Sequence, residues 1–138
     1  MTNNVGARYY EVTLTALRVM AGWLFSVHGG QKLFAWFGAE HAFTTWWPVG
    51  VAGVIEFFGG LAIALGVATR YVAFIAAGEM AVAFFWRHAA AQGSLWPWVN
   101  RGELPLLYCF IWLFLWTSGG GRWTLEAWWR NRIGRTAM

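Results

Sequence analysis

Three ionisable residues, Arg18, Glu56 and Glu79, each lie inside an apolar stretch long enough to cross a lipid bilayer. An ionisable group in the hydrocarbon region costs about 2.5–3.5 kcal/mol on insertion scales, so it is expected to be paired or to line a functional cavity. We predict that Arg18 and Glu79 lie at similar depth and form a structural charge pair. We assign Glu56, in the outer half of its helix, to a polar site.

A second group of polar residues is expected to fall toward the non-cytoplasmic side, given antiparallel helices that rise about 1.5 Å per residue. Histidine, carboxylate and tyrosine side chains beside aromatic walls can hydrogen-bond to a quinone carbonyl and exchange protons with it. We therefore predict a cofactor-binding site for a quinone or a similar amphiphile. Its candidate residues are His28, Lys32, Glu56, Glu103, Tyr108 and His88.

The same charges also have a purely structural interpretation. Lys32 could pair with Glu56 or Glu103 only to let the helices insert and to hold their register, as Arg18 could with Glu79. A buried charge left without its partner is expensive, so either role predicts that these residues matter for folding.

Two histidines on different helices, His28 and His88, raise axial ligation of haem b as a further hypothesis. We favour it less, because histidines at membrane ends are more often interfacial hydrogen-bonding groups. His41 is interpreted as a solvated loop residue. The sequence shows no catalytic triad, phosphate loop or metal-ligand spacing, so we assign no catalytic and no metal-binding residue.

The composition predicts the elements that must position these residues. The chain has 138 residues, 59% apolar and 12% charged, whereas soluble domains carry about 25% charged residues. We predict an all-α fold: a single domain forming a transmembrane four-helix bundle with a C-terminal interfacial amphipathic helix. The four helices are expected over about residues 9–27 (continuing toward Phe37), 49–67, 71–86 and 104–117, and the interfacial helix over about 122–133.

Charge and residue size refine this arrangement. Arginines gather in the N-terminal segment, in the turn at Arg70 and in the C-terminal tail, which predicts that both termini are cytoplasmic. Gly53 and Gly60 share one helix face with Glu56, a small-residue seam that permits close helix approach. In the tail, one apolar face suits the membrane surface. Its residues are Leu125, Trp128, Trp129 and Ile133.

Several short motifs follow one another along the chain, from roughly Leu14 to Leu125. They are Arg18 with Gly22, His28-Gly29-Gly30-Gln31-Lys32-Leu33, Gly53-x-x-Glu56-x-x-Gly59-Gly60, Leu65-Gly66-x-x-Thr69-Arg70, Glu79-Met80 with His88, Asn100-Arg101-Gly102-Glu103-Leu104, Tyr108, and Gly119-Gly120-Gly121 with Leu125. Their order resembles the DoxX/DoxD family of small four-helix membrane proteins. The tryptophan content is high for that family, and Glu126 stands where an Asp is expected.

The resemblance implies a multi-pass protein of the bacterial inner membrane that serves a redox complex, as in the membrane subunit of thiosulfate:quinone oxidoreductase. With the single cysteine Cys109 and no cofactor motif, the chain is not expected to be catalytic alone. Two alternatives stay open: a non-catalytic assembly or anchoring subunit, and a proton or small-solute pathway formed by an oligomer. The expected partners are the lipid bilayer and a protein partner or further copies of the chain, and not nucleic acid.

Overall fold

The computed structural model describes residues 3–39 and 46–136, and these residues form helices and loops without strands. The predicted all-α class is therefore confirmed, while His41 lies outside the described residues. The elements are α1 (Asn3–Phe34), the 3₁₀ helix η1 (Trp36–Gly38), the π-helical η2 (Trp46–Gly50), α2 (Val51–Val54), the π-helical η3 (Ile55–Gly59), α3 (Gly60–Leu65), α4 (Thr69–Val82), the π-helical η4 (Ala83–Ala90), α5 (Pro97–Asn100), α6 (Glu103–Ser118) and α7 (Leu125–Thr136).

The four predicted long helices correspond to four helical bodies. α1 begins at Asn3, earlier than the predicted residue 9, and it runs past residue 27 to Phe34, in line with the predicted continuation toward Phe37. Residues Trp47–Leu65 form one continuous helical segment that contains α2, η3 and α3. α4 runs on into η4, and α6 matches the fourth prediction. Gly66 ends α3 in the left-handed conformation, with φ of 74°.

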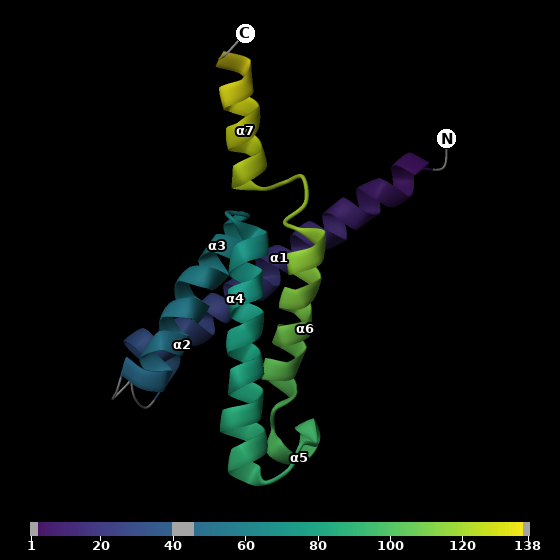
Figure 1. Cartoon of the computed structure of the whole chain (residues 1–138). Coiled ribbons are helices and arrows are strands. Elements are labelled where there is room, and N and C mark those ends of the chain that lie inside the picture. Colours follow the sequence, from purple (N-terminus) through teal and green to yellow (C-terminus); the bar gives the residue numbers. More distant parts are fainter. Residues whose placement is uncertain (1–2, 40–45, 137–138) are drawn as a thin grey trace.

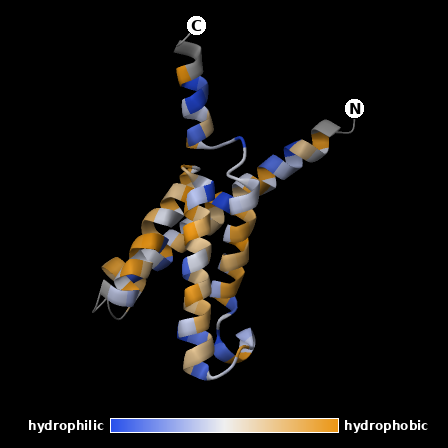
Figure 2. Cartoon of the chain, viewed as in Figure 1, coloured by the Kyte–Doolittle hydropathy of each residue, from blue (hydrophilic) through white to orange (hydrophobic). Residues whose placement is uncertain are grey.

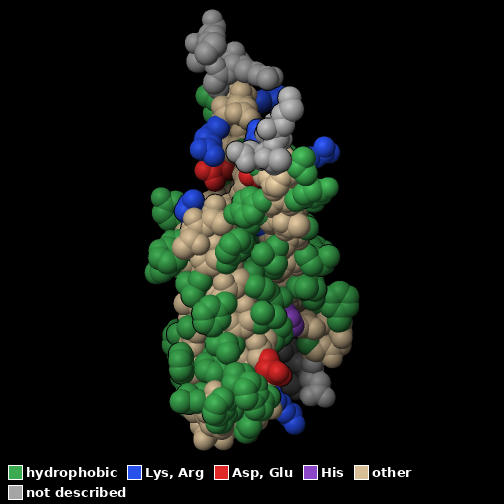
Figure 3. Space-filling view, turned by 90° about the vertical axis from the view of Figure 1, so that its right-hand side faces the viewer, with side chains coloured by type: hydrophobic (Ala, Val, Ile, Leu, Met, Phe, Trp, Pro, Cys, Tyr) green, Lys and Arg blue, Asp and Glu red, His purple; other side chains and the backbone are tan. Residues whose placement is uncertain are grey.

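One helical segment of the described chain, Trp47–Leu65, is both long and apolar enough to cross a membrane, with 19 residues and a mean hydropathy of 1.9. α6 is apolar but has 16 residues. Charged residues interrupt the other two long helices, among them Arg18 in α1 and Glu79 in α4. Apolar residues nevertheless cover the flank of the bundle, and charged side chains gather toward its two ends (Figures 2 and 3).

The helices pack mainly in two pairs, α4 with α6, and α1 with the segment from α2 to α3 (Figure 1). Both ends of the chain lie at the end of the bundle that holds the α3–α4 turn. At this end the Arg70 guanidinium donates hydrogen bonds to the carbonyls of Trp116 and Thr117, at 3.1 and 2.7 Å. This bundle end, which we call the terminal end, is where α6 stops and α7 begins.

The predicted C-terminal helix forms over Leu125–Thr136, slightly later than 122–133. Its orientation differs from the prediction, because α7 projects beyond the terminal end and does not lie across it (Figure 1). The residues of its apolar face are all exposed, and two of them also line a cavity with residues of α1 and α3. They are Leu125, Trp128, Trp129 and Ile133, of which Leu125 and Trp128 line the cavity.

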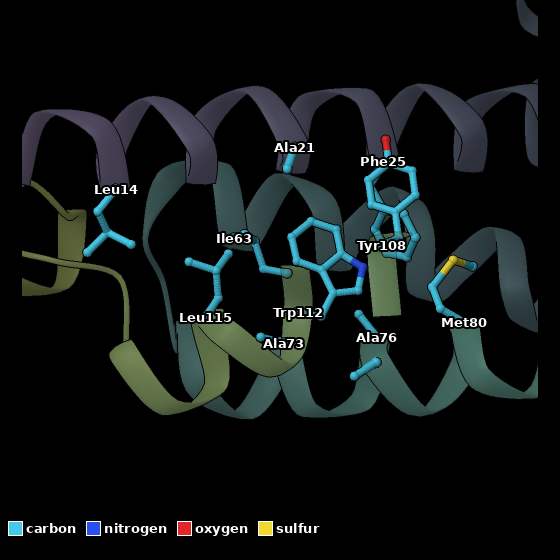
Figure 4. Close-up of a cluster of buried hydrophobic side chains, with 11 residues drawn as sticks. Leu14, Ala21, Phe25, Ile63, Ala73, Ala76, Met80, Tyr108, Trp112 and Leu115 are labelled. Carbon is cyan, nitrogen blue, oxygen red and sulfur yellow. The ribbon is translucent and has the colours of Figure 1, made fainter. Parts of the chain in front are cut away.

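The buried core is organised around Trp112 of α6, which is fully buried (Figure 4). The Phe25 ring of α1 packs edge-on against the indole ring, with the ring centroids 5.0 Å apart, and the Tyr108 ring stacks on the indole with the centroids 5.5 Å apart. Small residues of α4, such as Ala73 and Ala76, lie on the opposite side of the ring and leave room for it. The core therefore ties α1, α4 and α6 together beside the polar residues.

The predicted glycine seam of the second helix meets a matching seam in α1. A Cβ added to Gly22 would lie 2.7 Å from the backbone nitrogen of Ala64 and 2.7 Å from the carbonyl oxygen of Gly60. A Cβ added to Gly29 would lie equally close to the carbonyl oxygen of Gly53. Backbones in this contact can approach only because side chains are missing, as in small-residue helix pairs within membranes.

Candidate functional site

The prediction that Arg18 pairs with Glu79 is wrong. The Arg18 guanidinium, which is 2% exposed, donates hydrogen bonds to the carbonyl oxygens of Ile63, Ala64 and Trp123 at 2.7, 2.5 and 2.7 Å. The last residues of a helix leave carbonyls without intrahelical donors, and a cation there also complements the helix dipole. Arg18 therefore serves the C-terminal end of α3 and lies near the terminal end, not at mid-depth.

The ion pair of the site joins Lys32 of α1 to Glu56 of η3, with Nζ and Oε1 2.5 Å apart. This is one of the two pairings that the structural interpretation offers for Lys32. The Glu56 side chain is 3% exposed and that of Lys32 35% exposed. Glu56 is the tenth of the 19 residues of Trp47–Leu65, so it lies midway along this helical segment. Its predicted place in the outer half is therefore corrected.

A small cavity of about 160 Å³ lies beside this ion pair and collects five of the six predicted cofactor-binding residues. They come from α1, η3, η4 and α6, so segments far apart in the sequence meet here. The five are His28, Lys32, Glu56, His88 and Tyr108, and the other lining residues are Phe25, Met80, Ala83, Leu104 and Pro105.

Hydrogen bonds and ring contacts hold the side chains of the small cavity in place. His88 Nδ1 lies 3.1 Å from the carbonyl oxygen of Asn100. Asn100, which is 1% exposed, in turn accepts a hydrogen bond from the backbone N–H of Gly102 at 2.7 Å. The His28 ring meets Tyr108 edge-on at 6.3 Å. Asn100 was missing from the predicted site, although its place before a glycine and a new helix is a typical capping signal.

Glu103 does not join this group. It lies in the first turn of α6, where an acidic side chain is favoured by the helix dipole. Its side chain is exposed, while Leu104, Pro105 and Tyr108 of the same helix line the small cavity. The prediction considered only the depth of Glu103 along its helix. In the structure Glu103 lies on a different face of α6 from the residues that line the small cavity, so it is not part of the site.

A larger groove of about 450 Å³ lies between the segment that leads into η3 and the helix formed by α4 and η4. Lys32 and Ala83 line both the groove and the small cavity, so the two spaces meet at the ion pair. Glu79 lines the groove, and its Oε2 is buried without a hydrogen-bond partner. The remaining lining residues are Trp47, Pro48, Val49, Val51, Ala52, Ile55, Ile75, Gly78, Val82, Trp86 and Arg87.

The groove opens on the apolar flank of the bundle. Ile75 and Val82 on its α4 wall are exposed, and Trp47 and Trp86 from opposite walls are exposed with ring centroids 6.1 Å apart. Analysis of the sequence identified Glu79 but gave it a structural role. Nothing in the local sequence shows that these two helices separate at this level, so the groove could not be anticipated.

Both walls of the site contain π-helical turns. Glu56 lies in η3, and Arg87 and His88 lie in η4. Single π-helical turns within α-helices are often found at functional sites, because the extra residue re-aims the side chains that follow. No local sequence pattern predicts these turns.

The two spaces differ in which cofactor they can accept. The small cavity, with His28 and His88, lies below the range of about 300–1,000 Å³ that is typical of ligand pockets, so these residues do not fit haem b. The groove lies within that range. Its apolar walls and a few polar groups, at Lys32, Glu79 and Arg87, fit an aromatic ring with polar oxygens and an apolar tail.

Comparison with known proteins adds the following. The family model described as DoxX matches residues 13–89. An uncharacterised protein from Haemophilus influenzae is 37% identical over 129 residues, which cover 86% of this chain and 92% of that protein. No solved structure matches the chain. The residues matched by the family model include Lys32, Glu56 and Glu79, whereas Tyr108 lies beyond them.

Proposed function

Because the chain belongs to the DoxX family of membrane proteins, we propose that it is the membrane subunit of a redox system and binds a quinone in the groove beside Lys32 and Glu79. It would act in the bacterial inner membrane, with four spanning helices and both termini in the cytoplasm. A protein partner would supply the electrons, since one cysteine and no cofactor motif leave the chain without a redox centre of its own.

One observation carries this proposal: a buried carboxyl oxygen of Glu79 without a hydrogen-bond partner lines a groove whose walls are otherwise largely apolar. Such an oxygen costs free energy unless a ligand or a proton satisfies it. The groove opens toward the apolar flank, through which an amphiphile dissolved in the bilayer could enter head first. Its polar head would then meet Lys32 and Glu79, with its tail left among apolar side chains.

A bound quinone would supply two-electron, two-proton redox chemistry, and the chain would supply contacts and protons. The Lys32 ammonium can donate a hydrogen bond to a carbonyl oxygen of the ring. Glu79 can hold a proton at Oε2 and share it with a second oxygen. Glu56 fixes the position of Lys32 through the ion pair, and the tryptophan rings of Trp47 and Trp86 limit access of water.

The test is quinone retention by Glu79→Gln, with Glu103→Gln as the matched control. Both changes replace a carboxylate by an amide, but only Glu79 lines the groove, and Glu103 is exposed. Quinone is extracted from protein purified gently from native membranes and quantified per chain. We expect Glu79→Gln to lose most of its quinone and Glu103→Gln to match the wild type. Equal retention in all three proteins would refute the groove as the site.

The alternative function, an assembly or anchoring subunit, is favoured by a different observation. α7 projects beyond the bundle with Trp128 and Trp129 more than half exposed. If anchoring is the function, replacing both tryptophans with alanine should abolish co-purification of the partner and leave quinone retention unchanged. Co-purification that survives this change would remove α7 as the partner's anchor.

A further inference from the structure

A third cavity, unrelated to the groove, lies at the terminal end between the middle of α1, the end of α3 and the start of α7. Its volume is about 640 Å³. We call it the Arg18 cavity. Its polar lining includes Thr15 and Arg18 of α1 and Arg122, which precedes α7.

The polar groups of the Arg18 cavity leave hydrogen-bond donors unused. The two terminal nitrogens of Arg18 donate hydrogen bonds to three carbonyls, but its Nε is buried without a hydrogen-bond partner. The hydroxyl of Thr15 is also buried without a partner, and it lies one helical turn from Arg18 on the same face. These two donors belong to side chains that line the same cavity.

The charge of the cavity is positive. Arg18 and Arg122 line it, and no carboxylate does so among the residues that the structure describes. The carboxylate of Glu11 accepts a hydrogen bond from the backbone N–H of Arg122 at 2.8 Å, but Glu11 lines a neighbouring cavity. The Arg18 guanidinium, although it already binds three carbonyls, keeps its positive charge and one free donor with no carboxylate lining the cavity among the described residues. Guanidinium groups match the geometry of phosphate oxygens, so an anion is the ligand that these groups favour.

The remaining walls indicate what the anion is attached to. Val19, Leu65 and Leu125 offer apolar surface, and the rings of Trp123 and Trp128 are of the type found at the headgroup level of membranes. We propose that the Arg18 cavity binds the phosphate of an anionic phospholipid from the leaflet at the terminal end. Arg18 Nε, the Thr15 hydroxyl and the Arg122 guanidinium contact the phosphate oxygens, and the first acyl carbons lie on the apolar wall.

The test measures binding of phosphatidylglycerol to the full chain in phosphatidylcholine nanodiscs, by lipid-resolved native mass spectrometry. Because Arg18 also holds the end of α3, the variants are Thr15→Val and Arg122→Gln, with Arg130→Gln as the control. Arg130 is an exposed arginine of α7 that does not line the cavity. We expect each cavity variant to weaken phosphatidylglycerol binding by about tenfold, and Arg130→Gln to change it little.

Glycerol phosphate added to the same samples separates the two sources of phosphate. Failure to displace the lipid at millimolar concentration is expected of a lipid site. Displacement at micromolar concentration would overturn the lipid assignment in favour of a soluble phosphate ester. Equal binding of phosphatidylglycerol and phosphatidylcholine, or equal binding by wild type and both cavity variants, would overturn the site itself.

Discussion

At the scale of single residues, the buried charges have separate tasks. Arg18 binds backbone carbonyls at the end of α3, Lys32 pairs with Glu56, and Glu79 lines the groove without an ion pair. The position of every charge was evident from the sequence, because each interrupts an apolar run. Their partners were harder to predict, because a guanidinium satisfied by carbonyls leaves no complementary charge to look for. The one available signal was Gly66, which marks the helix end where those carbonyls become free.

Arg18 and Glu79 should therefore differ in their effect on stability. Arg18→Leu removes the donor from the Ala64 and Trp123 carbonyls, each of which costs about 1–3 kcal/mol if it stays buried and unsatisfied, while the Ile63 carbonyl keeps its hydrogen bond from the Gly66 N–H. Glu79→Leu removes a buried oxygen that has no hydrogen-bond partner, so stability should stay the same or rise. Thermal unfolding in detergent, followed by circular dichroism, measures both. An equal loss in Tm, cancelled in the double variant, would restore the charge pair.

Removing Lys32 or Glu56 from their ion pair should lower the stability of the protein by different amounts. Lys32→Met leaves a carboxylate that is 3% exposed without its partner, and breaking buried pairs in this way costs about 3–5 kcal/mol. Glu56→Gln should cost less, because the Lys32 side chain is 35% exposed and can turn toward water. The same unfolding assay applies, and the double variant should recover part of the loss. A larger loss of stability in Glu56→Gln than in Lys32→Met would contradict the expectation that the buried carboxylate is the costlier group to leave unpaired.

At the scale of elements, the fold depends on how closely α1 approaches the segment from α2 to α3. The helices themselves were predictable, because apolar runs separated by the short turn at Thr69 and by tryptophan-containing loops leave few alternatives. The start of α1 was placed too late, at about residue 9, because the polar residues before it gave no apolar pattern, whereas the helix begins at Asn3. The π-helical turns and the exposed direction of Glu103 depend on packing that no local pattern encodes.

Gly22→Ala tests the close approach. The added Cβ would lie 2.7 Å from two backbone atoms of the facing segment, which cannot move aside like a flexible side chain. We expect a loss of about 1–3 kcal/mol, typical of overpacking. Gly6→Ala in the same helix is the control, because nothing lies within 4 Å of its added Cβ. That change should be neutral or slightly stabilising, as expected for alanine in a helix. Matching melting temperatures for the two variants would contradict the seam.

At the scale of the whole molecule, an apolar flank separates two polar ends, and the groove opens on that flank while the Arg18 cavity lies at the terminal end. This arrangement fits a bundle that exchanges one amphiphile with the bilayer core and holds another at the headgroup level. Composition alone predicted the membrane class, because only 12% of the residues are charged. The groove and the Arg18 cavity could not be predicted, since both arise from contacts between segments that are distant in sequence.

The proposed orientation can be checked with two single-cysteine variants in a Cys109→Ser background. Gly6 is exposed near the start of α1, and Gln92 is exposed between η4 and α5. Figure 1 shows α5 at the end of the bundle opposite to the terminal end. In intact cells, a thiol reagent that cannot cross the inner membrane should label Gln92→Cys and spare Gly6→Cys. Permeabilised cells should label both. The reverse pattern in intact cells would place the termini outside.

Photoaffinity labelling with an azidoquinone in native membranes, followed by mapping of the modified residues, tests directly whether quinone binds in the groove. We expect labels on the two walls of the groove, in residues 47–55 and 75–87, with competition by unmodified quinone. We also expect Glu79→Gln to reduce this labelling and Glu103→Gln to leave it unchanged. Labels confined to α7 or to the outer face of α6, unaffected by Glu79→Gln, would contradict a quinone site in the groove.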